Sequence, residues 1–190
     1  MKKELYKLLM NPLSKQVFAF EEVVIDYNKY ITWVEYIYAS DCLSSIQEEI
    51  YPLLKYIGNG SEKINYWDLK SNLRSSMNNL GVEAPVGADA IKLYLYGYLQ
   101  EKLIIINSCS SSQLYDIVLH MYELLRGYAK IESFYPFLKI ADKQIYNDYI
   151  PYYTELEKRN DLINCINKYI SNHNIDILNQ QGRYYIKINN

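Results

Sequence analysis

The most regular hydrophobic pattern in the chain lies between residues 15 and 39. Apolar side chains follow one another there at alternating gaps of three and four residues: Val17, Phe20, Val24, Tyr27, Ile31, Val34 and Tyr38. This spacing places them on one face of an α-helix. A second apolar stripe runs beside the first through Val23, Tyr30, Trp33 and Ile37. The pattern predicts one central helix over residues 15–39 that packs between neighbours on two sides.

The same periodicity predicts further helices, over residues 41–57, 65–80, 110–128, 136–150 and 151–171. Pro52 lies inside the first of them and predicts a kink or break at Tyr51. Gly81 is expected to end the helix over 65–80, because glycine readily adopts the left-handed conformation that follows a helix. Ser110 and Gln113 have the spacing of a capping box, which favours a helix start at that point.

Residues 88–106 fit either a helix or a strand. The alternating tyrosines from 94 to 98 and the apolar run that ends at Ile106 suit a strand. The spacing of Ile91, Leu95 and Leu99 suits a helix instead, and Asp89 can cap it. We favour the helix.

The end of the chain changes to a different pattern. Ile175–Leu178 and Arg183–Ile188 are separated by a polar turn that contains Gly182, which predicts a β-hairpin. The predicted helices follow one another at loosely similar intervals, but no residue pattern repeats from one helix to the next. We therefore expect an all-α fold, an irregular bundle of about six to eight helices. It would form a single domain over residues 1–190, with a short C-terminal β-hairpin appendage over residues 173–190.

Tyrosine is the most unusual feature of the composition, with 22 of 190 residues. An A/T-rich genome explains this in part, since Ile, Asn and Lys are also abundant. Tyrosine has an apolar ring and a polar hydroxyl, which suits the boundary between core and water and also suits binding surfaces. Apolar residues make up 49% and charged residues 22%, as in ordinary globular proteins.

The charges are distributed unevenly although the net charge is only −2. Residues 1–15 hold four lysines and one glutamate, a net charge of +3. Residues 16–60 hold seven carboxylates and two lysines, a net charge of −5. Such an acidic block can attract a basic partner, although a solvated helix face is the simpler explanation.

The cysteines Cys42, Cys109 and Cys165 are odd in number and far apart. This favours reduced thiols and a cytoplasmic location. Lysine and glutamate interrupt the N-terminal segment, which does not resemble a secretory signal. The longest strongly apolar run, Leu103–Ile106, is too short to span a membrane.

The favoured function is non-enzymatic binding of a protein partner. The acidic block supplies the candidate binding residues: Glu21, Glu22, Asp26, Glu48 and Glu49. Its most concrete form is an immunity-type or antitoxin-type protein that neutralises a basic, nuclease-like toxin. We expect no cofactor and no metal. General affinity for nucleic acid is not expected either, since the pI is near 5.8.

An alternative is a nucleic-acid-binding regulator. The last predicted helix followed by a hairpin has the order of a recognition helix and wing. The cations that could contact a nucleic-acid backbone are Arg159, Lys168, Arg183 and Lys187. A purely structural hairpin is the simpler interpretation.

The third hypothesis is an enzyme that depends on a metal. Asp116, His120 and Glu123 follow one another at helical spacing, and these side chains can ligate a divalent cation. A solvated helix face is the simpler explanation, and a metal site would also need ligands from another helix. Cys109 precedes a helix, but a nucleophile also needs a base, so a partly buried thiol is favoured. For His173, at the predicted end of the last helix, we expect capping or plain exposure.

Overall fold

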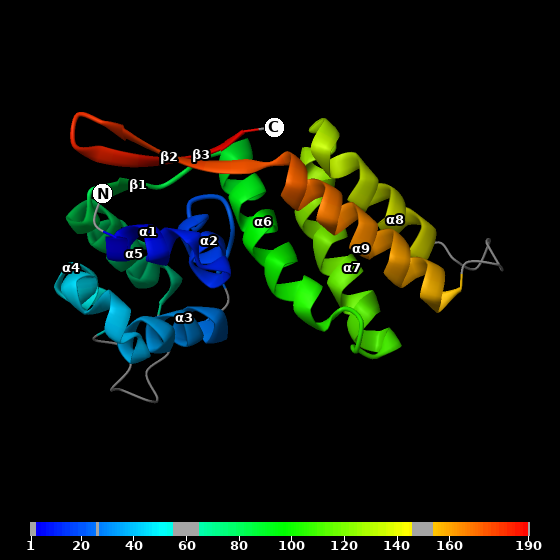
Figure 1. Ribbon diagram of the computed structural model, residues 1–190, viewed down its shortest axis with the longest axis horizontal. Helices are drawn as coiled ribbons and strands as arrows, with labels where there is room; N and C mark the ends of the chain where they lie inside the picture. Colours follow the sequence, from blue (N-terminus) through cyan, green and yellow to red (C-terminus); the bar gives the residue numbers. More distant parts are fainter. Residues whose placement is uncertain (1–2, 26, 55–64, 146–153, 190) are drawn as a thin grey trace. The chain divides into compact units, whose positions relative to one another are not determined.

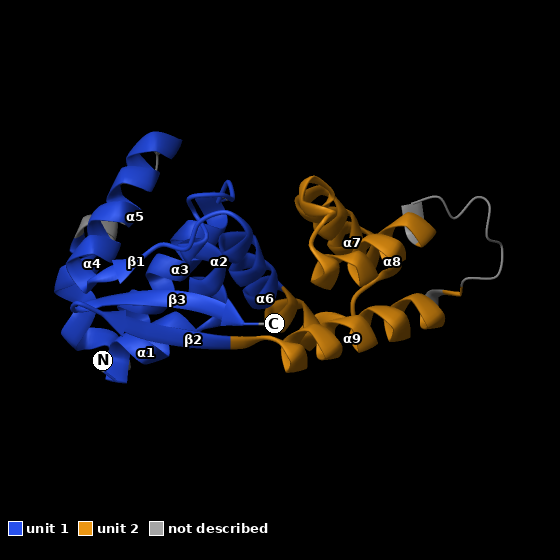
Figure 2. Cartoon of the chain, turned by 90° about the horizontal axis from the view of Figure 1, so that it is seen from above, with its two compact units in different colours: residues 1–98, 175–190 blue, residues 99–174 orange. Residues whose placement is uncertain are grey.

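The computed structural model describes residues 3–25, 27–54, 65–145 and 154–189. These contain nine α-helices, three short 3₁₀ helices and a three-stranded sheet, so the mostly helical class is confirmed (Figure 1). The chain divides into two compact units (Figure 2). Unit 1 comprises residues 1–98 and 175–190, and unit 2 comprises residues 99–174. The single domain stays a prediction, because two compact units of one chain can still fold together.

Unit 1 holds the N-terminal helices. They are α1 (Lys3–Met10), α2 (Pro12–Phe18), α3 (Tyr27–Ala39), the 3₁₀ helix η1 (Asp41–Ile46), α4 (Gln47–Leu54), α5 (Tyr66–Leu80) and the first part of α6 (Ala88–Ile105). Asn11 caps α2, because its side-chain oxygen accepts hydrogen bonds from the backbone of Leu13 at 2.9 Å and of Ser14 at 3.2 Å. Pro12 occupies the first position of α2, where its missing N–H has no partner to lose.

The single helix that the sequence predicts over residues 15–39 is wrong. α2 ends at Phe18, the chain turns, and α3 begins only at Tyr27. The turn buries Phe20, Val23 and Ile25 in the core, and this burial favours the turn over a continuous helix. The first predicted stripe is consequently split, and its members Val24 and Tyr38 are 76% and 71% exposed. The second stripe, from Val23 to Ile37, is the buried one.

Three other helical predictions in unit 1 have clear outcomes. Of the kink or break predicted at Tyr51, the break does not occur, since α4 continues through Pro52 to Leu54. Residues 55–57 of that predicted helix lie outside the described residues. α5 ends as expected at Gly81, which has a φ of 70° and donates its backbone N–H to the last turn. The helical alternative for residues 88–106 is confirmed by α6.

Unit 2 consists of the end of α6, α7 (Ser111–Leu125), the 3₁₀ helices η2 (Arg126–Tyr128) and η3 (Glu132–Phe134), α8 (Tyr135–Ile145) and α9 (Glu155–Asn172). The predicted capping box of Ser110 and Gln113 starts α7. A second capping box, Thr154 with Glu157, starts α9. The last helix therefore begins at Glu155 rather than at Pro151, which lies outside the described residues, as does the predicted stretch from 146 to 150.

The sheet belongs to unit 1 and is mixed. It contains β1 (Val82–Glu83), β2 (Asn174–Gln180) and β3 (Arg183–Asn189) in the order β1-β3-β2. β2 and β3 match the two strands predicted near the C-terminus. No strand was predicted at β1, which pairs in parallel with β3, with Val82 opposite Tyr184.

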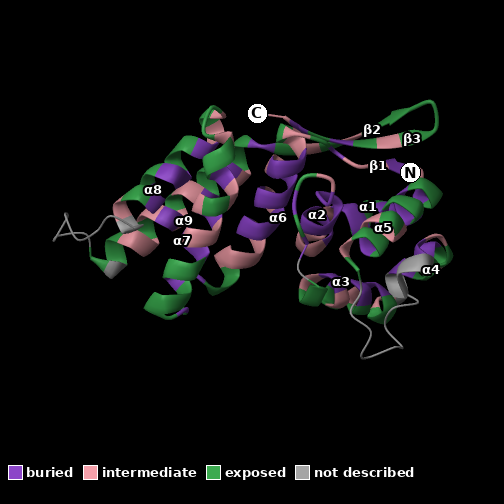
Figure 3. Cartoon of the chain, turned by 180° about the vertical axis from the view of Figure 1, so that it is seen from behind, coloured by how far each residue is buried: buried purple, intermediate pink, exposed green. Residues whose placement is uncertain are grey.

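The C-terminal strands contribute to the core of unit 1. Ile186 and Ile188 are buried in the same cluster as Leu73, Met77 and Val82. The turn between β2 and β3 is exposed, as Figure 3 shows. Within the described residues, no helix combines the length and the apolar character that crossing a membrane requires.

Candidate functional site

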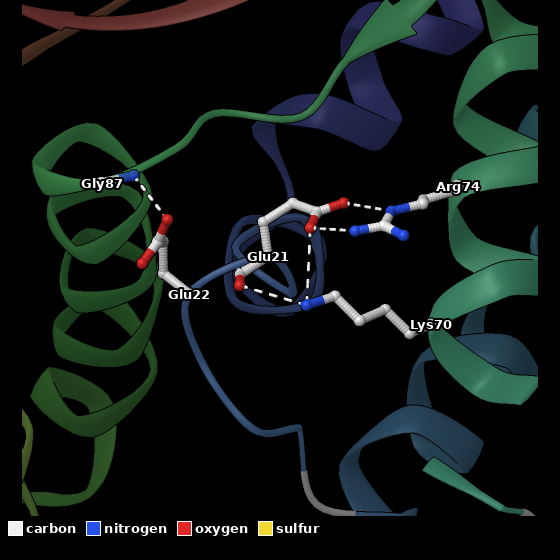
Figure 4. Close-up of polar contacts among 5 residues, drawn as sticks. All are labelled: Glu21, Glu22, Lys70, Arg74 and Gly87. Atoms are coloured by element: carbon white, nitrogen blue, oxygen red, sulfur yellow. Dashed lines mark hydrogen bonds and ion pairs between the residues drawn. The ribbon is translucent and has the colours of Figure 1, made fainter. Parts of the chain in front are cut away.

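Glu21, in the turn after α2, binds two cations of α5. Arg74 donates from Nε and Nη2 to the two carboxylate oxygens of Glu21, each at 2.6 Å (Figure 4). Nζ of Lys70 lies 3.4 Å from Oε2 of Glu21 and donates to its backbone carbonyl at 3.2 Å. The hydrogen bonds from Arg74 hold the pKa of the Glu21 carboxyl below its ordinary value, against the opposing effect of burial. The negative charge of Glu21 is therefore compensated within unit 1.

Glu22 links the same turn to the start of α6. Its Oε1 accepts a hydrogen bond from the backbone N–H of Gly87 at 2.9 Å (Figure 4). Gly87 has a φ of 58°, which most other residues adopt only with strain. Glu21 and Glu22 thus both have partners inside unit 1, and these contacts fix the turn to α5 and to the N-terminus of α6.

The other candidate residues of the acidic block are placed differently. Asp26 lies outside the described residues. Glu48 and Glu49 occupy the first turn of α4, where carboxylates also interact favourably with the helix dipole. Glu48 is exposed and Glu49 is half-buried. The acidic block therefore consists of one pair of residues engaged in the turn after α2 and another pair at the start of α4.

Two exposed tyrosines accompany the acidic side chains of α3 and α4. Tyr38 is 71% exposed and follows the exposed Glu35 by three residues on α3. Tyr51 is 59% exposed and follows the exposed Glu48 by three residues on α4. Residues three apart on a helix are surface neighbours. We call these two sets, Glu35 with Tyr38 and Glu48 with Tyr51, the acid–tyrosine pairs. The sequence alone could not show that Tyr38 and Tyr51 are exposed, because other tyrosines at similar helical spacing are buried.

The residues of the metal hypothesis share one helix, as predicted. Asp116 and Glu123 are exposed on α7 and His120 is half-buried. In the part of the chain that the structure describes, no group of three or more His, Cys, Asp or Glu side chains could hold a metal ion. Asp116, His120 and Glu123 therefore do not form such a group within the described residues.

Cys109 and Cys165 are free thiols in unit 2. Cys109 is buried, and Arg159 of α9 holds the loop around it. One guanidinium nitrogen of Arg159 donates to the carbonyl of Ile106 at 2.6 Å and lies 3.3 Å from the Cys109 sulfur. The other donates to the carbonyl of Cys109 at 2.6 Å. Arg159 thus binds two backbone carbonyls in the loop that follows α6. The other thiol, Cys165, has a pKa that burial raises above its ordinary value.

The cations of the nucleic-acid hypothesis are partly engaged elsewhere. Arg159 binds the loop after α6, as described above. Arg183 at the start of β3 forms an ion pair with Glu83 of β1. Lys168 and Lys187 are exposed. Of the two predicted wing strands, β3 pairs with β1 in the sheet of unit 1 and β2 pairs with β3, whereas α9 belongs to unit 2.

A buried polar cluster in unit 1 was not anticipated from the sequence. Lys15 of α2 is 1% exposed, and its Nζ lies 4.9 Å from the ring centre of Tyr96. Nζ of Lys29 donates to Oε1 of Gln16 at 2.6 Å and to the hydroxyl of Tyr94 at 3.2 Å. Burial lowers the pKa of Lys15 to about 8 and raises the pKa of Tyr96. An amine with such a pKa is reactive in principle, but this one is buried.

The sequence did contain one signal for this cluster. The Asn11-Pro12 pair marks the start of a helix, and recognising it would have placed Lys15 on a short helix within the N-terminal part of the core. The partners of Lys15 and Lys29 on α6 could not be found from local patterns, because they follow more than 60 residues later in the sequence.

Comparison with known proteins gives no family for this chain. No protein-family model matches it, and neither the curated proteins nor the solved structures gave a significant match.

Proposed function

We propose that the chain is a non-enzymatic, cytoplasmic protein-binding domain that recognises a basic partner through unit 1. Its most concrete form is an immunity-type or antitoxin-type protein that neutralises a basic, nuclease-like toxin. The observation that carries the proposal is the presence of the acid–tyrosine pairs on two consecutive helices. Each pair combines a charge that attracts a cation with an exposed ring that can be buried on binding.

The two components of each pair have different physical roles. Opposite charges accelerate the encounter of two proteins, and salt screens this effect with a Debye length near 8 Å at physiological ionic strength. A tyrosine that becomes buried at an interface instead slows dissociation. Glu48 belongs to the residues expected from the acidic block, and Glu35 joins it on the basis of its exposure beside Tyr38.

The first step of the test is to identify the partner. The full chain serves as bait in extracts of its native host, together with the double variant Glu35→Lys/Glu48→Lys. A matched control, Asp116→Lys/Glu123→Lys, changes the net charge equally on exposed positions of α7 in unit 2. We expect a basic protein that the unaltered chain and the control capture and that the first variant loses.

The second step measures the purified pair. At low salt, Glu35→Lys/Glu48→Lys should reduce the association rate about tenfold or more and leave the dissociation rate nearly unchanged. Tyr38→Ala/Tyr51→Ala should have the opposite profile. Expression of the partner alone should arrest growth, and co-expression of this chain should restore it. An acidic partner, or equal binding by both charge variants, would contradict the proposal.

A further inference from the structure

Unit 1 contains a pocket that is lined by other residues than the acid–tyrosine pairs. Its volume is about 310 Å³, at the lower end of the range for ligand pockets, roughly 300–1,000 Å³. Residues from α1, η1, α4, the end of α5, the β2–β3 turn and β3 line it. All of them belong to unit 1. The pocket can therefore be described without reference to unit 2.

The walls combine apolar surface with one carboxylate and neutral polar groups. Leu5, Ile46 and Leu80 supply apolar side chains, and Tyr184 adds a ring with a hydroxyl. Glu49 brings a carboxylate, and Asn78 and Asn79 bring amide groups.

The carboxyl end of α5 adds to the negative character of this pocket. A helix carries a partial negative charge at this end, because its last carbonyls lack partners within the helix. Gly81 lines the pocket, its N–H donates to the carbonyls of Met77 and Asn78, and its own carbonyl accepts a hydrogen bond from the N–H of Tyr184 at 2.8 Å. The side chain of Asn79 donates to the backbone carbonyl of Glu49 at 3.2 Å, which fixes the end of α5 to α4.

Among the described residues that line the pocket, none is basic. Arg183, which lies between the lining residues Gly182 and Tyr184 in the sequence, forms an ion pair with Glu83. A carboxylate and a helix carboxyl end in one partly apolar pocket favour a cation with a flat, weakly hydrated surface. A guanidinium group has this property, since it offers several N–H donors in its plane and stacks on aromatic rings.

We propose that this pocket receives an arginine side chain that the basic partner presents. This inference rests on the proposed function, because it supposes a basic protein partner. Glu49 pairs with the guanidinium group, the amide and carbonyl oxygens at the end of α5 accept its remaining N–H groups, and the Tyr184 ring contacts its face. The pocket thereby gives one of the residues of the acidic block, Glu49, a defined ligand.

The test uses N-acetyl-arginine amide as the probe and the full isotope-labelled chain. Its neutral analogue, N-acetyl-citrulline amide, has nearly the same shape without the charge. We expect arginine amide to shift the backbone amide signals of Leu80, Gly81, Gly182 and Tyr184, and citrulline amide to leave them in place. Glu49→Gln should weaken the binding of arginine amide about tenfold, the loss typical of a hydrogen bond to a charged group.

The matched control is Asp68→Asn, which removes an exposed carboxylate from the first turn of α5. This position is about 15 Å along the helix from Asn78, so binding should stay within twofold. Equal shifts with citrulline amide, no shifts at the pocket, or an equal loss in both variants would overturn the inference. The comparison of arginine with citrulline on the unaltered chain decides the matter even if Glu49→Gln does not fold.

The two proposals can fail separately. If arginine amide binds as expected but no basic partner exists, the pocket stands and the proposed function falls. The opposite result is that a basic partner depends on Glu35 and Glu48, but arginine amide and citrulline amide give equal shifts and Glu49→Gln does not weaken binding. In that case the proposed function stands and the arginine pocket falls.

Discussion

The interiors of the two units differ in polarity. Unit 2 is filled by apolar side chains from α7, α8 and α9, and the one buried polar residue described there is His173. Its ring stacks on Tyr169 with ring centres 4.0 Å apart, and its Nδ1 lies 2.8 Å from the Tyr169 carbonyl oxygen. Unit 1 instead buries Ser14, Lys15 and Gln16 side by side on α2, and Ser76 on α5.

This difference implies that the two units respond differently to small changes. An apolar interior can rearrange at modest cost, whereas buried polar groups depend on partners at fixed positions. The Trp33 indole nitrogen donates to the hydroxyl of Ser14 at 2.8 Å, and Lys29 bridges Gln16 and Tyr94. The arrangement of α2, α3 and α6 in unit 1 is therefore specified by particular polar contacts, and unit 2 is specified mainly by shape and periodicity.

The largest expected effects come from truncating one buried apolar residue in each unit. Ile37 in unit 1 and Met121 in unit 2 are both 0% exposed. Ile37→Ala and Met121→Ala should each lower the free energy of unfolding by about 2–5 kcal/mol, because each leaves a cavity. α6 belongs to both units, so we expect both variants to shift one common transition. Denaturant unfolding followed by tryptophan fluorescence and by circular dichroism measures this.

Two separated transitions, with one variant acting on each, would show that the units are independent domains. Val24→Ala is the matched control for unit 1. Its 76% exposure predicts a change below about 0.5 kcal/mol, although the hydrophobic pattern alone places Val24 in the core.

The same contrast explains which parts of the fold could be predicted from the sequence. The capping box at Ser110, the stop at Gly81 and the periodicity of α5 and α7 are local signals, and the structure follows them. The break between α2 and α3 depends on tertiary burial of the intervening turn. The short strand β1 forms because it pairs with residues about 100 positions later, which no local pattern reveals.

The candidate site could be predicted only in part for the same reason. Charge counts located the acidic block, but they could not show that Arg74 and Lys70 bind Glu21. Nor could they show that Glu49 lines a pocket with the end of α5 and β3. Those partners are distant in the sequence, and helical spacing relates residues of one helix only.

The second prediction tests the polar interior of unit 1 through Lys15. Its pKa is lowered by burial from 10.5 to about 8, so the unfolded chain binds its proton more tightly than the folded chain does. The free energy of unfolding should therefore rise between pH 8 and 10, by at most roughly 3 kcal/mol. Lys15→Met should stabilise the protein at pH 7 by about 2–3 kcal/mol and should lack this rise.

Urea unfolding at pH 7, 8, 9 and 10 measures both curves. Tyr96, whose pKa is raised, opposes the trend only above pH 10, where its stabilising effect is lost. Destabilisation by Lys15→Met at pH 7 would show that the contacts of the ammonium group outweigh the cost of burying it.

The third prediction compares two glycines. A Cβ at Gly97 of α6 would collide with the carbonyl oxygen of Pro12 and lie 2.9 Å from Cβ of Lys15. Gly97→Ala should lower the free energy of unfolding by about 1–2 kcal/mol, because overpacking outweighs the better helix propensity of alanine. Gly127 in unit 2 has nothing within 4 Å of such a Cβ, so Gly127→Ala should be neutral or stabilise by up to about 1 kcal/mol. Thermal unfolding measures both variants. Equal effects of Gly97→Ala and Gly127→Ala would show that the close approach of α2 to α6 at Gly97 does not limit stability.

The smallest expected effect concerns the ion pair of Glu21 with Arg74. Because the folded state lowers the pKa of Glu21, its contribution to stability is present above the ordinary carboxyl pKa near 4.3 and is lost as the pH falls through the folded value. Glu21→Gln should cost about 1 kcal/mol at pH 7, since the pair is bidentate but partly exposed. The difference from the unaltered chain should be smaller at pH 3 than at pH 7. Arg74→Gln should also lower stability, and the double variant should lose less than the sum of both. Urea unfolding of the four proteins at both pH values gives this coupling. Additive losses, or a cost as large at pH 3 as at pH 7, would mean that Glu21 and Arg74 do not stabilise each other and that the carboxylate is available to a partner.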